Sequence, residues 1–325
     1  MLPSDIYQYI TIFCKFKTII KLKATCKYLY NTIKIYDVPP KHHYKLNDEL
    51  IKKLPDLKRC YGNICNMNHG YITNEGIKYL TKLECLYQYD NMSIEILKTL
   101  TNLTELHLDY CDYVTDEAIL NLTKLRRLSI SYCPLITNNS ITKLVNLEYL
   151  DISRNSQIID NGIDKLTNLT TLYLMYRCGI TDSSIKSMSQ LQELSLLGNK
   201  VVSDNSITKL TNLKRLYLDQ NSIITDEGIK RLIKLDTLSD GSNLITDNGL
   251  KNLSQLRKLI CSNRNITDEG IKYLTSLKKL KLYYNNNITV NSINQLTKLE
   301  ELFLDEVPFI DKSQLLYLSL DNVYD

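Results

Sequence analysis

Residues 213–232 read LKRLYLDQNSIITDEGIKRL, and this stretch decides the expected fold because the chain repeats it. The shared pattern is LxxLxLxxNxxITDxGIxxL, where x is any residue. Most steps between units are 22 residues, and three are 20 or 21. A period of this length, kept over most of the chain, indicates a stacked repeat architecture. The units begin at Leu83, Leu103, Leu125, Leu147, Leu169, Leu191, Leu213, Leu235, Leu256, Leu277 and Leu299.

The two halves of each unit differ in periodicity. In the first half, leucines such as Leu216 and Leu218 alternate with other residues, which predicts a strand with one buried face. In the second half, apolar residues lie three apart, which favours a short helix or 3₁₀ turn that Thr225 or Asp226 can cap. One unit cannot bury its own leucines, but stacked units can. We therefore expect an α/β solenoid, a horseshoe with a parallel sheet on its concave face.

The ninth position of the unit is also repeated. An amide there can bond the backbone of the turn that follows the strand, where polar groups would otherwise lack partners. Asp240 stands where a buried leucine is expected, and the pattern does not explain it. Arg177, Arg264 and Val307 interrupt the column, and Cys178 beside Arg177, with Asn263 or Asn265 beside Arg264, indicates one-residue slips. The column contains Asn91, Asn155, Asn199, Asn221, Asn243 and Asn285, with Cys111 and Cys133.

Composition narrows the possible functions. The 325 residues carry 40 Lys+Arg against 36 Asp+Glu, a balance with no general attraction to nucleic acid or anionic membranes. No apolar run approaches the roughly 18 residues of a membrane span, and the N-terminus lacks the pattern of a secretory signal. The nine cysteines, without CxxC pairs, favour free thiols in a reducing compartment. We expect an intracellular protein, cytoplasmic or nuclear.

Catalytic and metal-binding signatures are missing from the sequence. There is no GxGxxG, GxxxxGK[ST] or HExxH, and the four histidines form no Ser/His/Asp arrangement. Cys60, Cys65 and His69 are candidate metal ligands, but their spacing fits no common zinc pattern and no fourth ligand is evident. The His42-His43 pair is a weaker candidate and is interpreted as a solvated pair in the linker. We therefore expect no metal, no cofactor and no enzymatic activity.

The N-terminal segment lies outside the repeat. Ile6, Ile10 and Phe13 follow helical spacing, which predicts short amphipathic helices. On physical grounds alone, such helices can act as a cap that covers the first repeat. Pro39-Pro40 marks a boundary, and Asn47 can cap a helix that runs through Leu54. The expected divisions are a helical module at 1–40, a linker and cap helix at 41–56, about 11–12 repeats of 20–22 residues at 57–320, and a tail at 321–325.

The repeat resembles leucine-rich repeats, and its ITDxG stretch with Cys111 and Cys133 is most similar to the cysteine-containing subclass, although these units are shorter. The N-terminal Leu-Pro-x-Asp-Ile and the later Cys-Lys-x-Leu resemble an F-box. The chain has no Trp, so Tyr28 or Tyr30 stands where many F-boxes have Trp. An F-box ahead of leucine-rich repeats implies a substrate-recognition adaptor of a Skp–cullin–F-box ubiquitin ligase. The implied residues that dock on the Skp-type linker are Leu2, Pro3, Ile6, Ile10, Leu22 and Cys26.

Strand positions between the buried leucines should face the concave side. Many of them are tyrosines, a residue favoured at protein interfaces, although AT-rich codon usage explains part of the total of 23. Basic residues add positive charge toward the C-terminal end, where a partner would present acidic groups; they are Lys258, Arg264, Lys279 and Lys281. We expect a protein substrate to bind at a surface centred on Tyr149, Tyr173, Met175, Tyr176 and Tyr217.

Two alternatives remain open. The chain can be a stand-alone leucine-rich-repeat scaffold or effector whose N-terminal segment is only a cap. Nucleic-acid binding through aromatic and basic concave positions is a weaker third hypothesis, and our expectation is that neither nucleic acid nor membrane is a partner. The codon bias, joined to the resemblance, points to a giant DNA virus or an AT-rich protist as the source.

Overall fold

The computed structural model describes residues 48–61, 73–87, 93–221, 223–316 and 323–324. The chain divides into two compact units, Met1–Asn146 and Leu147–Asp325. Short strands alternate with four-residue helices in both. The N-terminal unit contains α4 (Asp48–Ile51), β1 (Arg59–Tyr61), α5 (Asn74–Ile77), β2 (Cys85–Tyr87), α6 (Ile94–Leu97), β3 (Glu105–His107), α7 (Asp116–Ile119), β4 (Arg127–Ser129) and α8 (Asn138–Ile141).

The C-terminal unit continues the alternation. Its elements are β5 (Tyr149–Asp151), α9 (Asp160–Ile163), β6 (Thr171–Tyr173), α10 (Asp182–Ile185), β7 (Glu193–Ser195), α11 (Asp204–Ile207), β8 (Arg215–Tyr217), α12 (Asp226–Ile229), β9 (Thr237–Asp240), α13 (Asp247–Leu250), β10 (Lys258–Cys261), α14 (Asp268–Ile271), β11 (Lys279–Tyr283), α15 (Val290–Ile293), β12 (Glu301–Asp305), the 3₁₀ turn η2 (Lys312–Gln314) and β13 (Val323–Tyr324).

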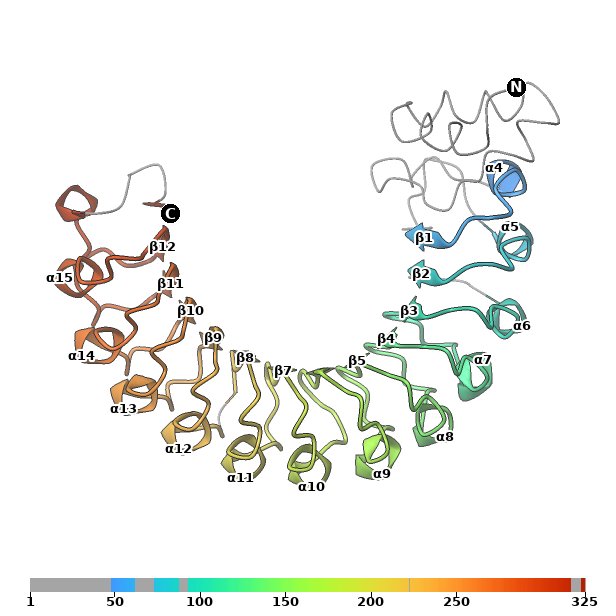
Figure 1. Cartoon of the computed structure of the whole chain (residues 1–325), viewed down its shortest axis with the longest axis horizontal. Coiled ribbons are helices and arrows are strands. Elements are labelled where there is room, and N and C mark those ends of the chain that lie inside the picture. Colours follow the sequence, from blue (N-terminus) through green and yellow to red (C-terminus); the bar gives the residue numbers. More distant parts are fainter. Residues whose placement is uncertain (1–47, 62–72, 88–92, 222, 317–322, 325) are drawn as a thin grey trace, which may run out of the picture. The chain divides into compact units, whose positions relative to one another are not determined.

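Each unit has a parallel sheet in which the strands follow chain order. Strands β1 to β4 pair in sequence in the N-terminal unit, and β5 to β13 do so in the C-terminal unit. Leucine lies opposite leucine, as in the pairing of Leu194 with Leu216. In Figure 1 the strands of each unit lie on one side and the helices on the other. The expected repeat of strand and helical turn is therefore confirmed.

The core consists of the leucine and isoleucine columns. Leu216, Leu218, Ile224, Ile229 and Leu232 all have an exposed fraction of 0%. Burying each side chain of this size stabilises the fold by about 1.5–3 kcal/mol. Because each repeat contributes the same residues, the core extends along the stack instead of surrounding one centre.

The turn after each strand is held by the ninth-position amide, as expected. Asn221 Oδ1 accepts hydrogen bonds from the backbone N–H groups of Ile223 (2.9 Å) and Ile224 (3.0 Å). Its Nδ2 donates to the carbonyl oxygen of Asn199 in the preceding repeat (2.8 Å). One side chain thus satisfies its own turn and joins two repeats. Asn155, Asn199 and Asn285 make the same pair of turn bonds, while Asn91 lies outside the described residues.

Asn243 does not belong to this column, and our assignment of it was wrong. It is exposed, with a left-handed φ of 57°, because the unit from Leu235 is one residue short. Asp240 holds this turn instead, accepting from the Ser242 N–H (3.0 Å) and hydroxyl (2.6 Å). Asn263, the slipped column residue of the next repeat, donates to Asp240 (2.6 Å). Burial raises the pKa of Asp240 against the opposing hydrogen bonds from Ser242 and Asn263.

The threonine and the aspartate of each ITD turn have different roles. Thr225 caps α12 by accepting the N–H of Glu227 (3.2 Å). Asp226 is not a cap, contrary to one of our two assignments, because it accepts from the N–H and the hydroxyl of Thr246 in the next repeat (both 2.7 Å). The aspartates of these turns therefore link successive helical turns.

The same link explains the small residue of the ITDxG pattern. A Cβ at Gly228 would lie 2.3 Å from Asp204 Oδ1 of the preceding repeat. Where serine takes this place, its hydroxyl joins the link, as Ser206 does by donating to Asp182 (2.6 Å). In the described repeats, this place is glycine or serine wherever the preceding repeat supplies the aspartate; Ala118 and Ile96 occur where it does not.

The first described helix, α4, ends at Ile51 and does not continue to Leu54 as we expected. The chain turns there as it does after every repeat helix, with the Leu54 N–H donating to the Ile51 carbonyl (2.8 Å). Asp48 accepts from the N–H (2.7 Å) and hydroxyl (2.5 Å) of Thr73. The helix therefore makes the same link as the later repeat helices. No helix within the described ranges is long and apolar enough to cross a membrane.

Candidate protein-interaction surface

The C-terminal unit has a sheet face, which we define by the residues on either side of each central strand leucine. These side chains alternate with the buried leucines and so point away from the core. The sheet face consists of Tyr149, Asp151, Thr171, Tyr173, Glu193, Ser195, Arg215, Tyr217, Thr237, Ser239, Lys258, Ile260, Lys279, Lys281, Glu301 and Phe303.

The five residues that we expected at the centre of a binding surface all lie in this unit. Tyr149, Tyr173 and Tyr217 belong to the sheet face on β5, β6 and β8, and Met175 and Tyr176 follow β6 in the next turn. All five are half-buried. The structure therefore places them on and after strands β5, β6 and β8 of one sheet, with each side chain partly exposed.

The tyrosines of the sheet face are held by a network that includes two charged residues. Tyr149 and Tyr173 meet edge to face, with ring centroids 5.4 Å apart. The Tyr173 hydroxyl donates to Glu193 Oε1 (2.5 Å), and Arg215 Nε donates to Glu193 Oε2 (2.6 Å). Burial, followed by the Glu193 hydrogen bond, raises the pKa of Tyr173 above its ordinary value. These side chains are therefore fixed before any partner arrives, which lowers the entropic cost of binding.

Tyr176 is packed on both sides of its ring. The Arg154 guanidinium lies 4.5 Å from the ring centroid, within the range of a cation–π contact. On the next repeat, a Cβ added to Gly198 would lie 2.7 Å from Tyr176 Cδ1. Tyr176 has a left-handed φ of 62°, and the residues at the same turn position of other repeats, such as Tyr132, Gly198 and Gln220, share this conformation. The fold does not require tyrosine at this position.

A related cluster occurs in the N-terminal unit. Glu105 accepts from the Tyr87 hydroxyl (2.9 Å) and from Arg127 Nε (3.2 Å), and His107 Nε2 lies 3.1 Å from the same carboxylate. The rings of Tyr87 and His107 are stacked, 3.9 Å between centroids. Burial opposes ionisation of Glu105, but hydrogen bonds from His107 and Tyr87 outweigh it and lower the pKa of Glu105.

Our sequence reasoning missed the acidic and basic members of both clusters. In each case a glutamate and an arginine are separated by one repeat, as Glu105 is from Arg127 and Glu193 from Arg215. The register pairs them directly across neighbouring strands. This spacing is visible in the sequence, and aligning the residue before each central leucine would have revealed both pairs.

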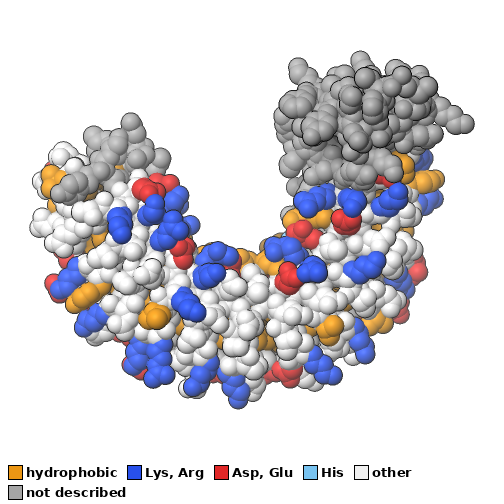
Figure 2. Space-filling model, viewed as in Figure 1, with side chains coloured by type: hydrophobic (Ala, Val, Ile, Leu, Met, Phe, Trp, Pro, Cys, Tyr) orange, Lys and Arg blue, Asp and Glu red, His pale blue; other side chains and the backbone are white. Residues whose placement is uncertain are grey.

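The basic residues expected near the C-terminal end lie on and beside the sheet face. Lys258 is on β10, Lys279 and Lys281 are on β11, and Arg264 is exposed in the turn after β10. Lys279 pairs with Glu301 (2.6 Å), and Lys281 Nζ lies 5.2 Å from the ring centroid of Phe303. Figure 2 shows Lys and Arg side chains gathered at this end of the unit, with a few acidic ones among them.

The residues assigned to the F-box resemblance lie outside the described residues, as do Cys65, His69 and the His42-His43 pair. They are Leu2, Pro3, Ile6, Ile10, Leu22 and Cys26. Within the described part of the chain, no three His, Cys, Asp or Glu side chains are grouped to hold a metal ion. Burial raises the pKa of the Cys60 thiol to about 12, which disfavours the thiolate that binds metals.

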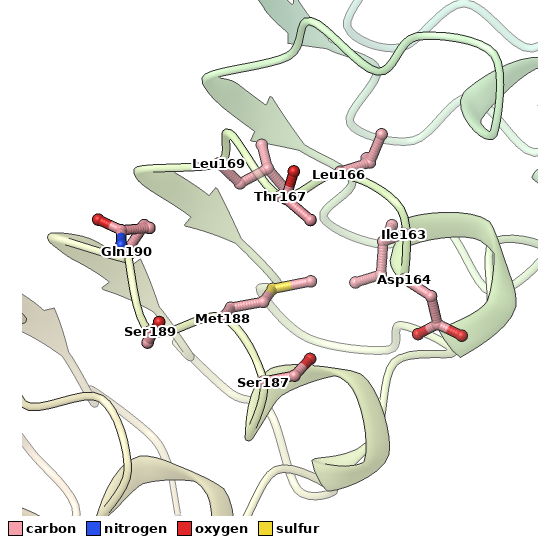
Figure 3. A pocket seen from close by; sticks show the side chains of 9 residues that line it. All are labelled: Ile163, Asp164, Leu166, Thr167, Leu169, Ser187, Met188, Ser189 and Gln190. Atoms are coloured by element: carbon pink, nitrogen blue, oxygen red, sulfur yellow. The ribbon is translucent and has the colours of Figure 1, made fainter.

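A pocket of about 330 Å³ lies between the turns that follow α9 and α10. Met188 lines it at the position where Leu210 and Leu232 occur in later repeats (Figure 3). Asp164, Ser187 and Gln190 surround the apolar part. Its lining includes no residue of the sheet face, so it is separate from the candidate surface.

A family model described as leucine-rich repeat matches residues 99–122 and 209–232. The chain is built of leucine-rich repeats. An internalin (inlF) from Listeria monocytogenes is similar in structure, with 25% identity, a TM-score of 0.63, and coverage of 95% of this chain and 93% of that one. A leucine-rich-repeat protein from Leptospira interrogans has 23% identity and a TM-score of 0.53, covering 89% of this chain and 83% of the other.

A third similar structure comes from the complex of Rad7 and Elc1 in yeast. It has 17% identity and a TM-score of 0.59, covering 99% of this chain and 88% of that chain. At this identity the likeness shows the fold alone. No curated protein matches the chain in sequence.

Proposed function

We propose that the chain is a protein-interaction scaffold that holds a protein partner on the sheet face of its C-terminal unit. The observation that carries this proposal is the fixed aromatic and charged network around Tyr173, Glu193 and Arg215. Tyrosine and arginine are the residues that most often dominate the energy of protein interfaces. A network formed before binding gives up little conformational freedom on association.

Tyr176 supports the same proposal from a different direction. Its contact with Arg154 keeps a large ring half-exposed where glycine satisfies the fold in the next repeat. The fold does not require tyrosine here, because glycine fits the same turn in the next repeat, whereas a partner would gain a rigid aromatic surface.

We further propose that the scaffold serves as the substrate-recognition adaptor of a Skp–cullin–F-box ubiquitin ligase. Residues 1–40 would dock on the Skp-type linker through Leu2, Pro3, Ile6, Ile10, Leu22 and Cys26. This step rests on the resemblance of those residues to an F-box and on the order of F-box and repeats. The mechanism is proximity, because holding a substrate beside the ligase raises its effective concentration without chemistry by the scaffold itself.

Affinity purification with mass spectrometry tests both levels. The full chain is compared with a Leu2→Ala/Pro3→Ala variant and with a Tyr149→Ser/Tyr176→Gly variant. The first variant should lose the ligase linker and keep the substrate, and the second should lose the substrate and keep the linker. Recovery of a substrate without any ligase subunit would support the stand-alone scaffold or effector and exclude the adaptor.

A further inference from the structure

The residues immediately before the central strand leucines form a column whose charges follow a rule. Glu193 lies opposite Arg215, Lys279 lies opposite Glu301, and in the N-terminal unit Glu105 lies opposite Arg127. Opposite charges across neighbouring strands stabilise a sheet, and like charges there destabilise it. The described repeats therefore place charges in this column in favourable pairs.

One pair breaks the rule. Lys258 lies directly opposite Lys279 on β10 and β11, and Ile260 lies opposite Lys281. Only Lys279 has an acidic partner, Glu301; neither Lys258 nor Lys281 is within salt-bridge distance of a described carboxylate. Parallel strands are about 4.8 Å apart, so positive charge accumulates here at a cost to the fold. No feature of the repeat requires it, because Thr171 and Thr237 fill the same column elsewhere.

Apolar side chains lie among these lysines. Ile260 and Phe303 are half-buried on the sheet face, and Lys281 Nζ lies 5.2 Å from the centroid of the Phe303 ring. A ligand that meets this surface must neutralise cations and also cover apolar area. A nucleic-acid backbone supplies the first and not the second, whereas a peptide with alternating acidic and apolar side chains supplies both, since its side chains alternate with the same period as the strands.

We propose that β10 to β12 bind an extended acidic segment of a partner protein, with its carboxylates on Lys258 and Lys281 and an apolar side chain on Ile260 and Phe303. This inference rests on the proposed interaction function and adds the chemistry of the partner. It places the acidic contact two strands or more from Tyr217 on β8. The two parts of the sheet face can therefore be changed independently.

Fluorescence anisotropy of the full chain with labelled ten-residue peptides tests the inference. One peptide alternates Glu with Leu and Phe, a second has Gln for every Glu, and a third has Ser for every apolar residue. The first should bind at least about tenfold more tightly than either of the others, and its affinity should fall as salt is raised. Equal binding of the first two peptides would overturn the proposal.

Variants of the chain locate the site. Lys258→Gln/Lys281→Gln should weaken binding of the acidic peptide about tenfold or more, and removing the Lys258–Lys279 repulsion should leave its urea midpoint unchanged or higher. The matched control is Lys298→Gln, an exposed lysine outside the sheet face, which should keep affinity within about twofold. An equal loss in the control, or equally tight binding of a short DNA duplex, would show general charge attraction and overturn the proposal.

Failure of this inference is distinguishable from failure of the proposed function. If the acidic peptide does not bind while the Tyr149→Ser/Tyr176→Gly variant still loses its substrate in the purification, only the acidic segment is excluded. If the peptide binds as expected and no protein copurifies with the full chain, the scaffold function fails and the peptide site remains.

Discussion

Glu105 in the N-terminal unit and Glu193 in the C-terminal unit occupy the same place in their repeats and bind the same partners. Each accepts from a tyrosine on the preceding strand and an arginine on the following strand. The clusters differ two residues further on, where one has His107 and the other Ser195. We name them the Glu105 cluster (Tyr87, Glu105, His107, Arg127) and the Glu193 cluster (Tyr173, Glu193, Ser195, Arg215).

The difference between His107 and Ser195 changes the contacts of the tyrosine, although the repeat gives both clusters the same backbone positions. Stacking of His107 on Tyr87 occupies a ring face and adds a third bond to Glu105. In the Glu193 cluster, Ser195 does not fill that space, and Tyr173 instead meets the edge of Tyr149. The backbone positions are shared, so the side chain at one sheet position decides which neighbouring ring the tyrosine contacts.

The largest effect should come from the leucines beneath the two clusters. Leu106→Ala and Leu194→Ala each remove a fully buried side chain and should destabilise the chain by about 2–5 kcal/mol, measured by urea unfolding. Similar losses would show that the two units have equivalent cores and that the clusters differ only at the surface. A loss several-fold smaller at one site would break the comparison at the level of the core.

Removing the central carboxylates should have the next largest effect. Glu193→Ala leaves the half-buried Tyr173 hydroxyl without its acceptor and should cost about 1–3 kcal/mol in urea unfolding. Glu105→Ala removes four contacts, those with Tyr87, His107 and Arg127 and one from the Cys85 thiol (3.6 Å), and should cost at least as much. The matched control is Tyr173→Phe, made in the natural chain and in the Glu193→Ala variant. In the Glu193→Ala variant it should lower the free energy of unfolding very little, because the shared hydrogen bond is already lost. Full additivity of the two changes would contradict the shared hydrogen bond.

The repeat, its parallel sheet and the ninth-column amides could be predicted from the sequence, because each depends on residues that recur at a fixed spacing. The aspartates could not be assigned correctly in this way. An aspartate that caps its own helix and an aspartate that binds the next repeat occupy the same position in the sequence pattern. Only the structure shows that Asp226 binds Thr246 of the next repeat. Nor does the repeat pattern assign Asp240, whose carboxylate holds the turn of a unit that is one residue short.

The candidate site was predictable in position and not in its contacts. Alternation placed Tyr173 and Tyr217 on the exposed side of the strands, and the structure has them there. It did not reveal that Glu193 holds Tyr173, because a hydrogen bond between strands depends on side-chain reach as well as on register. Nor did it reveal the left-handed φ that recurs at the turn position of Tyr176, since φ is not encoded by hydrophobic spacing.

Lowering the pH should reduce the free energy of unfolding that Glu105 contributes, by less than the Glu105→Ala substitution does. The folded pKa of Glu105 lies below the ordinary value of 4.5, so the unfolded chain takes up the proton more readily. The contribution of Glu105 to stability is therefore complete above that ordinary value and is lost as pH falls through the lowered pKa. The urea midpoints of the natural chain and Glu105→Gln, measured from pH 7 to pH 3, should converge as the pH falls.

The matched control for this titration is Leu106→Ala. It leaves every carboxylate in place, so its difference from the natural chain should change little over the same pH range. Midpoints of Glu105→Gln that run parallel to those of the natural chain down to pH 3 would show that the Glu105 contacts do not depend on its charge.

The smallest effect on stability should come from removing the two arginines. Comparing the two variants tests whether one cluster binds a partner and the other does not. The side chains of Arg127 and Arg215 are 47% and 46% exposed, and exposed ion pairs contribute about 0–1 kcal/mol. Arg127→Ala and Arg215→Ala should therefore unfold at nearly the natural urea concentration. Because the Glu193 cluster lies in the proposed binding surface, only Arg215→Ala should reduce recovery of the protein partner in affinity purification. Equal losses of the partner from both variants would remove the distinction between the clusters and extend the binding surface to the N-terminal unit.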